Sequence, residues 1–239
     1  MKKFIAFCSL ALALVFQAKG KNDVTYSDAG LWSTVSLDYA LNKRWAIVFA
    51  EEFRMRENYS RVNLFYTNLG IEYTQGKHFK TSLVYRNIQR QNLENTFMIR
   101  HRLMWDATLR TKWKKLSFSY RHRLQVEYRA IHSIPTGKIP EWYSRSKFEL
   151  GYQYSKKINP YAAVELRYQI FDPRNMVSDH TWHRVRYQVG FDYRLNKFSK
   201  VGLYYLVQRV FNVSNYEHLY ITGVEYSASL ADMKFFNKK

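Results

Sequence analysis

The chain has 239 residues, of which 18% are aromatic, and it carries a formal net charge of +19 at pH 7. Nine glycines and four prolines are too few for a fibrous or disordered protein, and one cysteine cannot form a disulfide framework. A charge of this size is typical of proteins that bind nucleic acid or an anionic membrane surface.

Residues 1–20 have the features of a secretory signal peptide. Lys2 and Lys3 precede an apolar run from Phe4 to Phe16, and small residues follow at Ala18 and Gly20. The run is too short for a transmembrane helix, which needs about 20 apolar residues. We therefore predict cleavage after Gly20 and a single domain over residues 21–239. The only cysteine would leave with the signal, and we expect neither a metal nor a cofactor.

The segments that follow alternate apolar and polar residues. In residues 116–129 every second side chain is apolar, aromatic or histidine, and the side chains between them are mostly charged. Because successive side chains of a strand point to opposite sides, this pattern predicts a strand with one apolar and one charged face. The same alternation recurs at 35–39, 97–110, 145–154, 164–170, 184–194 and 220–226.

The length of these runs separates two β architectures. Most reach the roughly 9–11 tilted residues of a membrane strand, whereas strands of soluble proteins have roughly 5 or 6. We therefore predict an all-β fold, a transmembrane antiparallel up-and-down β-barrel with its apolar face towards lipid. Closure would satisfy the backbone hydrogen bonds that hydrocarbon cannot. A soluble β-sandwich or lipocalin-like barrel is the alternative.

The connections between the runs are of two kinds. Short polar turns are predicted at 41–44, 74–77, 111–115, 155–159 and 195–200, and longer joins at 130–141 and 172–180. Bacterial outer-membrane barrels have short periplasmic turns and longer external loops, which orients the chain in the outer membrane. Eleven runs are clear, but such barrels have even strand numbers. With the short polar segment 22–30 as an additional upward strand, we predict 12 strands, with 10 as the alternative.

Several short motifs are shared with one barrel family. They are Leu31-Trp32, Glu51-Glu52-Phe53-Arg54, Tyr85-Arg86, His101-Arg102, the run from Tyr120 to Arg129, Gly151-Tyr152 and the run from His183 to Gly190. In these motifs the chain resembles the domain-of-unknown-function family 2490, outer-membrane barrels common in Bacteroidota, over essentially the whole processed chain. The resemblance implies a membrane barrel and assigns no activity.

The charged face of the strands is the main chemical feature. Two interpretations remain open: a packed salt-bridge network inside a narrow barrel, which we favour, and a basic wall for anionic solutes. The predicted lumen network comprises Arg100, Arg102, Arg121, Arg123, Glu127, Arg129, Arg145, Glu149, Glu165, Arg167, Arg184, Arg186, Asp192 and Glu225.

The histidines allow an enzymatic alternative. His101 and His122 both face outward on adjacent strands, and we expect them to lie nearly opposite one another, with Ser144 and Ser146 one strand further on. Barrel enzymes that act on lipids place a serine and a histidine on the lipid-facing wall. The sequence has no His-x-Ser motif of that kind, so we interpret these histidines as packing residues. His180 and His183 would face opposite sides and cannot share a metal ion.

Three outward tryptophans, Trp45, Trp105 and Trp142, are predicted to form aromatic girdles at the membrane boundaries. The sequence does not decide whether Trp32 and Trp182 face outward or into the barrel. Three functions follow from the pattern: a non-enzymatic structural or interaction component of the envelope, a narrow channel for small or anionic solutes, and a lipid-modifying enzyme. The expected partners are outer-membrane lipids, lipopolysaccharide and, during biogenesis, the barrel-assembly machinery. Because the protein is expected to be exported, we do not expect nucleic acid to be a partner.

Overall fold

A computed structural model describes residues 26–92, 94–129, 135–213 and 216–230. The predicted signal peptide at 1–20 lies outside these residues, as does the start of the predicted first strand at 22–25. Among the described residues, no helix is both long and apolar enough to cross a bilayer.

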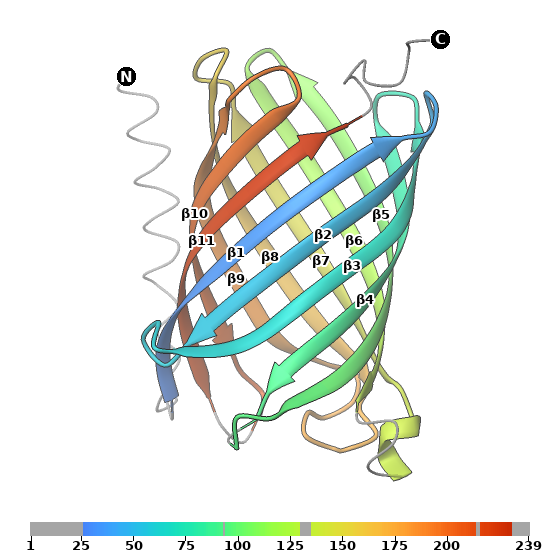
Figure 1. Cartoon of the computed structure of the whole chain (residues 1–239), viewed down its shortest axis with the longest axis vertical. Coiled ribbons are helices and arrows are strands. Elements are labelled where there is room, and N and C mark those ends of the chain that lie inside the picture. The colour runs from blue at the N-terminus through green and yellow to red at the C-terminus, as the bar shows by residue number, and fades with distance from the viewer. Residues whose placement is uncertain (1–25, 93, 130–134, 214–215, 231–239) are drawn as a thin grey trace.

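Eleven strands form one closed β-barrel (Figure 1). They are β1 (Tyr26–Ala40), β2 (Trp45–Arg56), β3 (Arg61–Gln75), β4 (Phe79–Gln91), β5 (Phe97–Trp113), β6 (Leu116–Arg129), β7 (Glu141–Tyr152), β8 (Ile158–Phe171), β9 (Thr181–Arg194), β10 (Ser199–Val210) and β11 (Glu217–Ser229). A short 3-10 helix, η1 (Pro135–Lys138), precedes β7. Each strand pairs with its neighbours in the chain, and β1 pairs with β11 to close the barrel.

The prediction of 12 strands, and its alternative of 10, is wrong. Residues 26–30 do not form a separate upward strand but extend β1, so β1 and β11 run parallel along Tyr26 to Asp38. All other pairs are antiparallel. The polar start of β1 is stabilised because the carboxylate of Asp28 accepts hydrogen bonds from the backbone N–H groups of Glu57 (2.9 Å) and Asn58 (2.9 Å).

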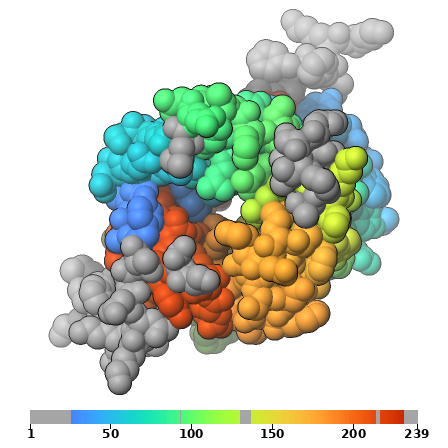
Figure 2. Space-filling model, turned by 90° about the horizontal axis from the view of Figure 1, so that it is seen from below, coloured from blue at the N-terminus to red at the C-terminus, as the bar shows by residue number. Residues whose placement is uncertain are grey.

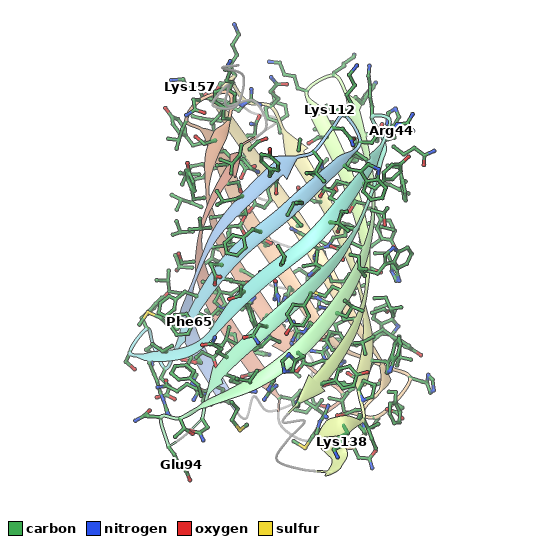
Figure 3. All side chains as sticks on the ribbon, turned by 45° about the vertical axis from the view of Figure 1, so that its right-hand side comes forward. Arg44, Phe65, Glu94, Lys112, Lys138 and Lys157 are labelled. Atoms are coloured by element: carbon green, nitrogen blue, oxygen red, sulfur yellow. The ribbon has the colours of Figure 1, made fainter. Side chains whose placement is uncertain are left out.

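The two ends of the barrel differ in their connections. One end, here called the turn end, carries the short turns after β1, β3, β5, β7 and β9; the other, the loop end, carries the connections after β2, β4, β6, β8 and β10. Figure 3 shows Arg44, Lys112 and Lys157 at the turn end and Glu94 and Lys138 at the loop end. Because the strand number is odd, β1 begins at the loop end and β11 finishes at the turn end.

The alternation predicted from sequence sets which side chains face the lumen. Along β5 the exposed fraction changes from 46% at Leu103 to 2% at Met104, 47% at Trp105 and 7% at Asp106. Large apolar side chains therefore cover the outer wall, while polar and charged side chains are enclosed. This is the reverse of a soluble β-sandwich, whose apolar face is inside.

Some of the enclosed apolar residues form two clusters in the lumen. Trp32, Tyr204, Leu206 and Ile221 pack together on the β10–β11–β1 side, and Leu64, Tyr66 and Ile88 pack on β3 and β4. Gly223 permits the first cluster, because a Cβ atom there would lie 1.9 Å from the Tyr204 ring. The charged residues fill the lumen mainly along β5 to β9.

Candidate functional site

A row of four arginines crosses the lumen wall on neighbouring strands. In the strand register Arg123 of β6 pairs with Arg145 of β7, Arg145 with Arg167 of β8, and Arg167 with Arg184 of β9. Like charges placed directly opposite one another on a sheet repel. The row therefore requires nearby carboxylates, and the inward positions on either side provide them.

Glu127 is the centre of the network near the loop end. Its side chain is 2% exposed and contacts three arginines: Arg100 (3.3 Å), Arg129 (2.9 Å) and Arg102. The buried hydroxyl of Tyr143 donates a further hydrogen bond to it at 3.0 Å. A carboxylate buried to this extent is stable only when such partners compensate its lost hydration.

Glu141 forms a second centre directly beside Glu127 in the register. It contacts Arg129, Arg167 (2.9 Å) and Arg174 (2.9 Å), and the Gln169 amide donates to it at 3.2 Å. The guanidinium of Arg167 also stacks on the Tyr143 ring, 3.6 Å from its centroid. Together these side chains form a dense layer across the β5–β9 side of the lumen.

Glu165 organises the middle of the barrel. Its carboxylate accepts hydrogen bonds from Arg121 (2.9 Å), Arg186 (3.1 Å) and Arg145. Beside it, Arg123 forms a two-point ion pair with Asp106, with Nε to Oδ1 at 2.5 Å and Nη2 to Oδ2 at 2.6 Å. Paired contacts of this kind fix the planar guanidinium in one orientation.

The remaining predicted residues lie outside these centres. Glu149 pairs with Lys147 (2.9 Å) and Asp192 with Lys200 (2.6 Å), and both pairs are partly exposed near the turn end. Among the described residues, Glu225 and Arg184 have no ion pair, and the Nε of Arg184 is buried without a partner. These two side chains are not part of the paired network.

Sequence reasoning missed several members of the network. Glu52 pairs with Arg54 and Arg86, and Arg54 lies over the ring of Trp32, 3.5 Å from the centroid. Glu141 was missed because the sequence places it in a predicted loop, whereas it is the first residue of β7. Glu52, Arg54, Arg86 and Asp106 occupy the alternate strand positions that face the lumen, so the alternation pattern could have identified them.

The charged side chains leave two small cavities in the lumen. A middle cavity of about 220 Å³ lies between Trp32, Arg54, Glu165 and Tyr204, and a second of about 200 Å³ lies closer to the turn end. Arg121 and Lys147 line both. Figure 2, seen from the loop end, shows the mouth largely filled, with a narrow gap near its centre.

Two of the polar pairs on the outer wall include the histidines singled out from the sequence. Tyr85 and His101 form a hydrogen bond of 2.7 Å, and His122 and Ser146 form one of 3.2 Å. The prediction that His101 and His122 lie opposite one another is wrong, because the register pairs His101 with Tyr128 and His122 with Ala107. His183 is buried, 1% exposed, and His180 lies before β9.

The outward tryptophans lie at two levels along the barrel axis, near the strand ends and at mid-strand. Trp45 and Trp142 lie near strand ends and are 41% and 38% exposed, but Trp105 lies at the midpoint of β5 rather than at a membrane boundary. Trp113 and Trp182 are further outward residues near strand ends, and Trp32 faces the lumen. Within the described ranges, no three His, Cys, Asp or Glu side chains are arranged to hold a metal ion.

An all-β closed barrel with ionic pairs buried in its lumen is thus the class that fold and site define. The chain belongs to the family described as "Protein of unknown function (DUF2490)", whose sequence profile matches residues 29–218. The family predicted from the sequence motifs is confirmed. No curated protein matches the chain.

Proposed function

We propose that the protein is a bacterial outer-membrane barrel, exported by its N-terminal signal peptide. The apolar outer wall supports this proposal: Leu69, Leu83 and Leu103 are 55%, 48% and 46% exposed, while Asp106, on the same strand as Leu103, is only 7% exposed. Exposing so much apolar surface to water is unfavourable, and acyl chains would cover it without cost.

In this setting the turn end faces the periplasm and the loop end faces outward. The partners of the outer wall are outer-membrane lipids, including lipopolysaccharide, and the chain reaches the membrane through the barrel-assembly machinery. Trp45 and Trp113 at one end and Trp142 and Trp182 at the other suit the two aromatic girdles of a membrane barrel.

We further propose that the barrel is a non-enzymatic structural or interaction component of the envelope with a filled lumen. One observation carries this: the layer around Glu127 and Glu141, with Tyr143, Gln125 and Gln169, is 0–2% exposed. A lipid-modifying enzyme is less well supported, because no carboxylate or amide contacts His122 beside Ser146 within the described part of the chain. A catalytic histidine normally has such an orienting group.

A narrow channel for small anions is the second candidate. The gap in Figure 2 and the basic lining of the two lumen cavities favour it. Rings of basic side chains select anions in known pores.

Planar-bilayer conductance of the purified protein separates the two functions. The filled lumen predicts no steps above the background of a detergent blank. Discrete steps with reversal potentials that favour chloride over potassium would instead establish the channel. Glu127→Gln provides the internal comparison, because loosening the buried layer around Glu127 should introduce conductance where the native protein has none.

A further inference from the structure

The middle cavity is more basic than its ion pairs can balance. Its lining has seven basic side chains and three carboxylates. Two further carboxylates, Asp106 and Glu149, pair with Arg123 and Lys147 of the lining. Five carboxylates therefore face seven cations, a surplus of two positive charges in an enclosed space. Burying unbalanced charge of one sign is costly unless a counter-ion accompanies it.

The ion pairs show how the surplus arises. Glu165 is shared by Arg121, Arg145 and Arg186, and Glu52 is shared by two more arginines. The next residue of the arginine row, Arg184, has no ion pair among the described residues. The Nε–H of Arg121 is also buried without a partner. Of these two arginines only Arg121 lines the middle cavity, so its Nε–H is a lining donor that the protein leaves unsatisfied.

We propose that the middle cavity binds a small divalent oxyanion of the phosphate class. Guanidinium groups donate paired hydrogen bonds that match the oxygens of phosphate, and arginine is the residue most suited to this recognition. A volume of about 220 Å³ holds one such anion with a few waters, since each water takes about 30 Å³. A dianion would neutralise the surplus of two charges.

Access to the site is from the turn end. The second cavity shares Arg121 and Lys147 with the first and extends to Glu72, Lys80 and Arg110, which lie near the ends of their strands on that side. Towards the loop end, the layer of Glu127 and Glu141 fills the β5–β9 side. The wall encloses the site on its lateral side, so a free anion rather than a lipid headgroup is the ligand.

This inference rests on the lumen alone and does not require the membrane location proposed above. Conductance therefore tests the filled lumen, and anion binding tests this site, so one can fail without the other. The intact protein in neutral detergent is sufficient for the binding experiment.

The experiment titrates inorganic phosphate into the purified protein by calorimetry, with sodium chloride at equal ionic strength as the blank. Tryptophan fluorescence provides a second readout, because Trp32 lines the cavity. We expect saturable heat at about millimolar phosphate or below and a fluorescence change that Trp32→Phe removes. Phosphate heat equal to that of chloride would overturn the proposal.

Three variants locate the site. Arg121→Gln should weaken phosphate binding about tenfold, because it removes one charge-assisted donor. Glu225→Gln should tighten binding, because it removes a lining carboxylate that has no ion pair in the described residues. Arg44→Gln makes the same charge change at an exposed turn and should leave binding unchanged. Equal effects of the two arginine variants would contradict a lumen site, and the Glu225 variant keeps the test decisive if Arg121→Gln fails to fold.

Discussion

Single carboxylates position several arginines each in this lumen. Glu127 and Glu165 each contact three guanidinium groups, and Glu141 contacts three as well. Removing one partner of a buried network is more damaging than removing the whole network, because the charges left behind lose both hydration and counter-charge. The acids are therefore the residues on which the packing of the lumen depends.

Glu127→Gln should reduce the free energy of unfolding by about 3–5 kcal/mol, because Arg100, Arg102 and Arg129 would share one carboxylate fewer. Urea unfolding in detergent micelles measures the change. Glu57→Gln is the matched control: its side chain is 42% exposed beside Arg61, and exposed pairs contribute about 0–1 kcal/mol. Similar losses for both variants would show that the buried network adds nothing to stability.

Asp172 shows how a loop residue is tied to the same network. Its carboxylate accepts hydrogen bonds from the backbone N–H groups of Arg174 (3.1 Å), Met176 (3.1 Å) and Val177 (3.3 Å). The loop turned in this way directs the Arg174 side chain to Glu141. The connection between β8 and β9 thus extends the lumen network into the loop end.

At the scale of the strands, the outer face decides what the barrel contacts. Leu69 lies in the middle of β3 at 55% exposure, and Leu41 lies in a turn at 51% exposure. In water the two leucines are equivalent, and an arginine at either would be tolerated. In a bilayer only the mid-strand position meets hydrocarbon.

Leu69→Arg should therefore destabilise the barrel in phospholipid vesicles by about 2–4 kcal/mol, the cost of a basic side chain at the bilayer midplane. Leu41→Arg should change stability by about 0–1 kcal/mol, because it lies outside the strands. The measurement is reversible urea unfolding in vesicles. Equal stability of the two variants would mean that β3 does not face lipid.

The faces of the strands could be predicted from sequence because alternation is a local property. The strand number could not, since the pairing of β1 with β11 joins residues about 190 positions apart and leaves no local pattern. Residues 26–30 were predicted to lie in a separate strand because bacterial barrels have even strand numbers. The partners that hold Asp28 within β1, at Glu57 and Asn58, are visible only in three dimensions.

The candidate site was predictable only in part for the same reason. Parity identifies Arg121, Arg145 and Glu165 as facing the lumen, but the sequence does not show that one carboxylate serves three arginines. The four-arginine row follows from the register of β6 to β9 and not from spacing along the chain. The surplus of charge in the middle cavity depends on the sharing of carboxylates between arginines and on this strand register.

The whole molecule carries its basic charge unevenly. The turns of the turn end contain Lys43, Arg44, Lys77, Lys114, Lys115, Lys156, Lys157 and Lys197 and no acidic residue. Lys114 and Lys197 lie over the rings of Trp113 (5.3 Å) and Phe198 (4.5 Å). Lysines stacked on aromatic rings at a rim suit the boundary between hydrocarbon and headgroups. In the proposed orientation this basic rim meets the periplasmic leaflet.

In the proposed membrane barrel, acyl chains cover the outer wall. Sedimentation of the purified, refolded protein with and without detergent tests it directly. We expect a folded monomer in detergent micelles and aggregation once detergent is removed, because the exposed leucines and aromatic residues would then face water. A folded monomer that persists in plain buffer would contradict it.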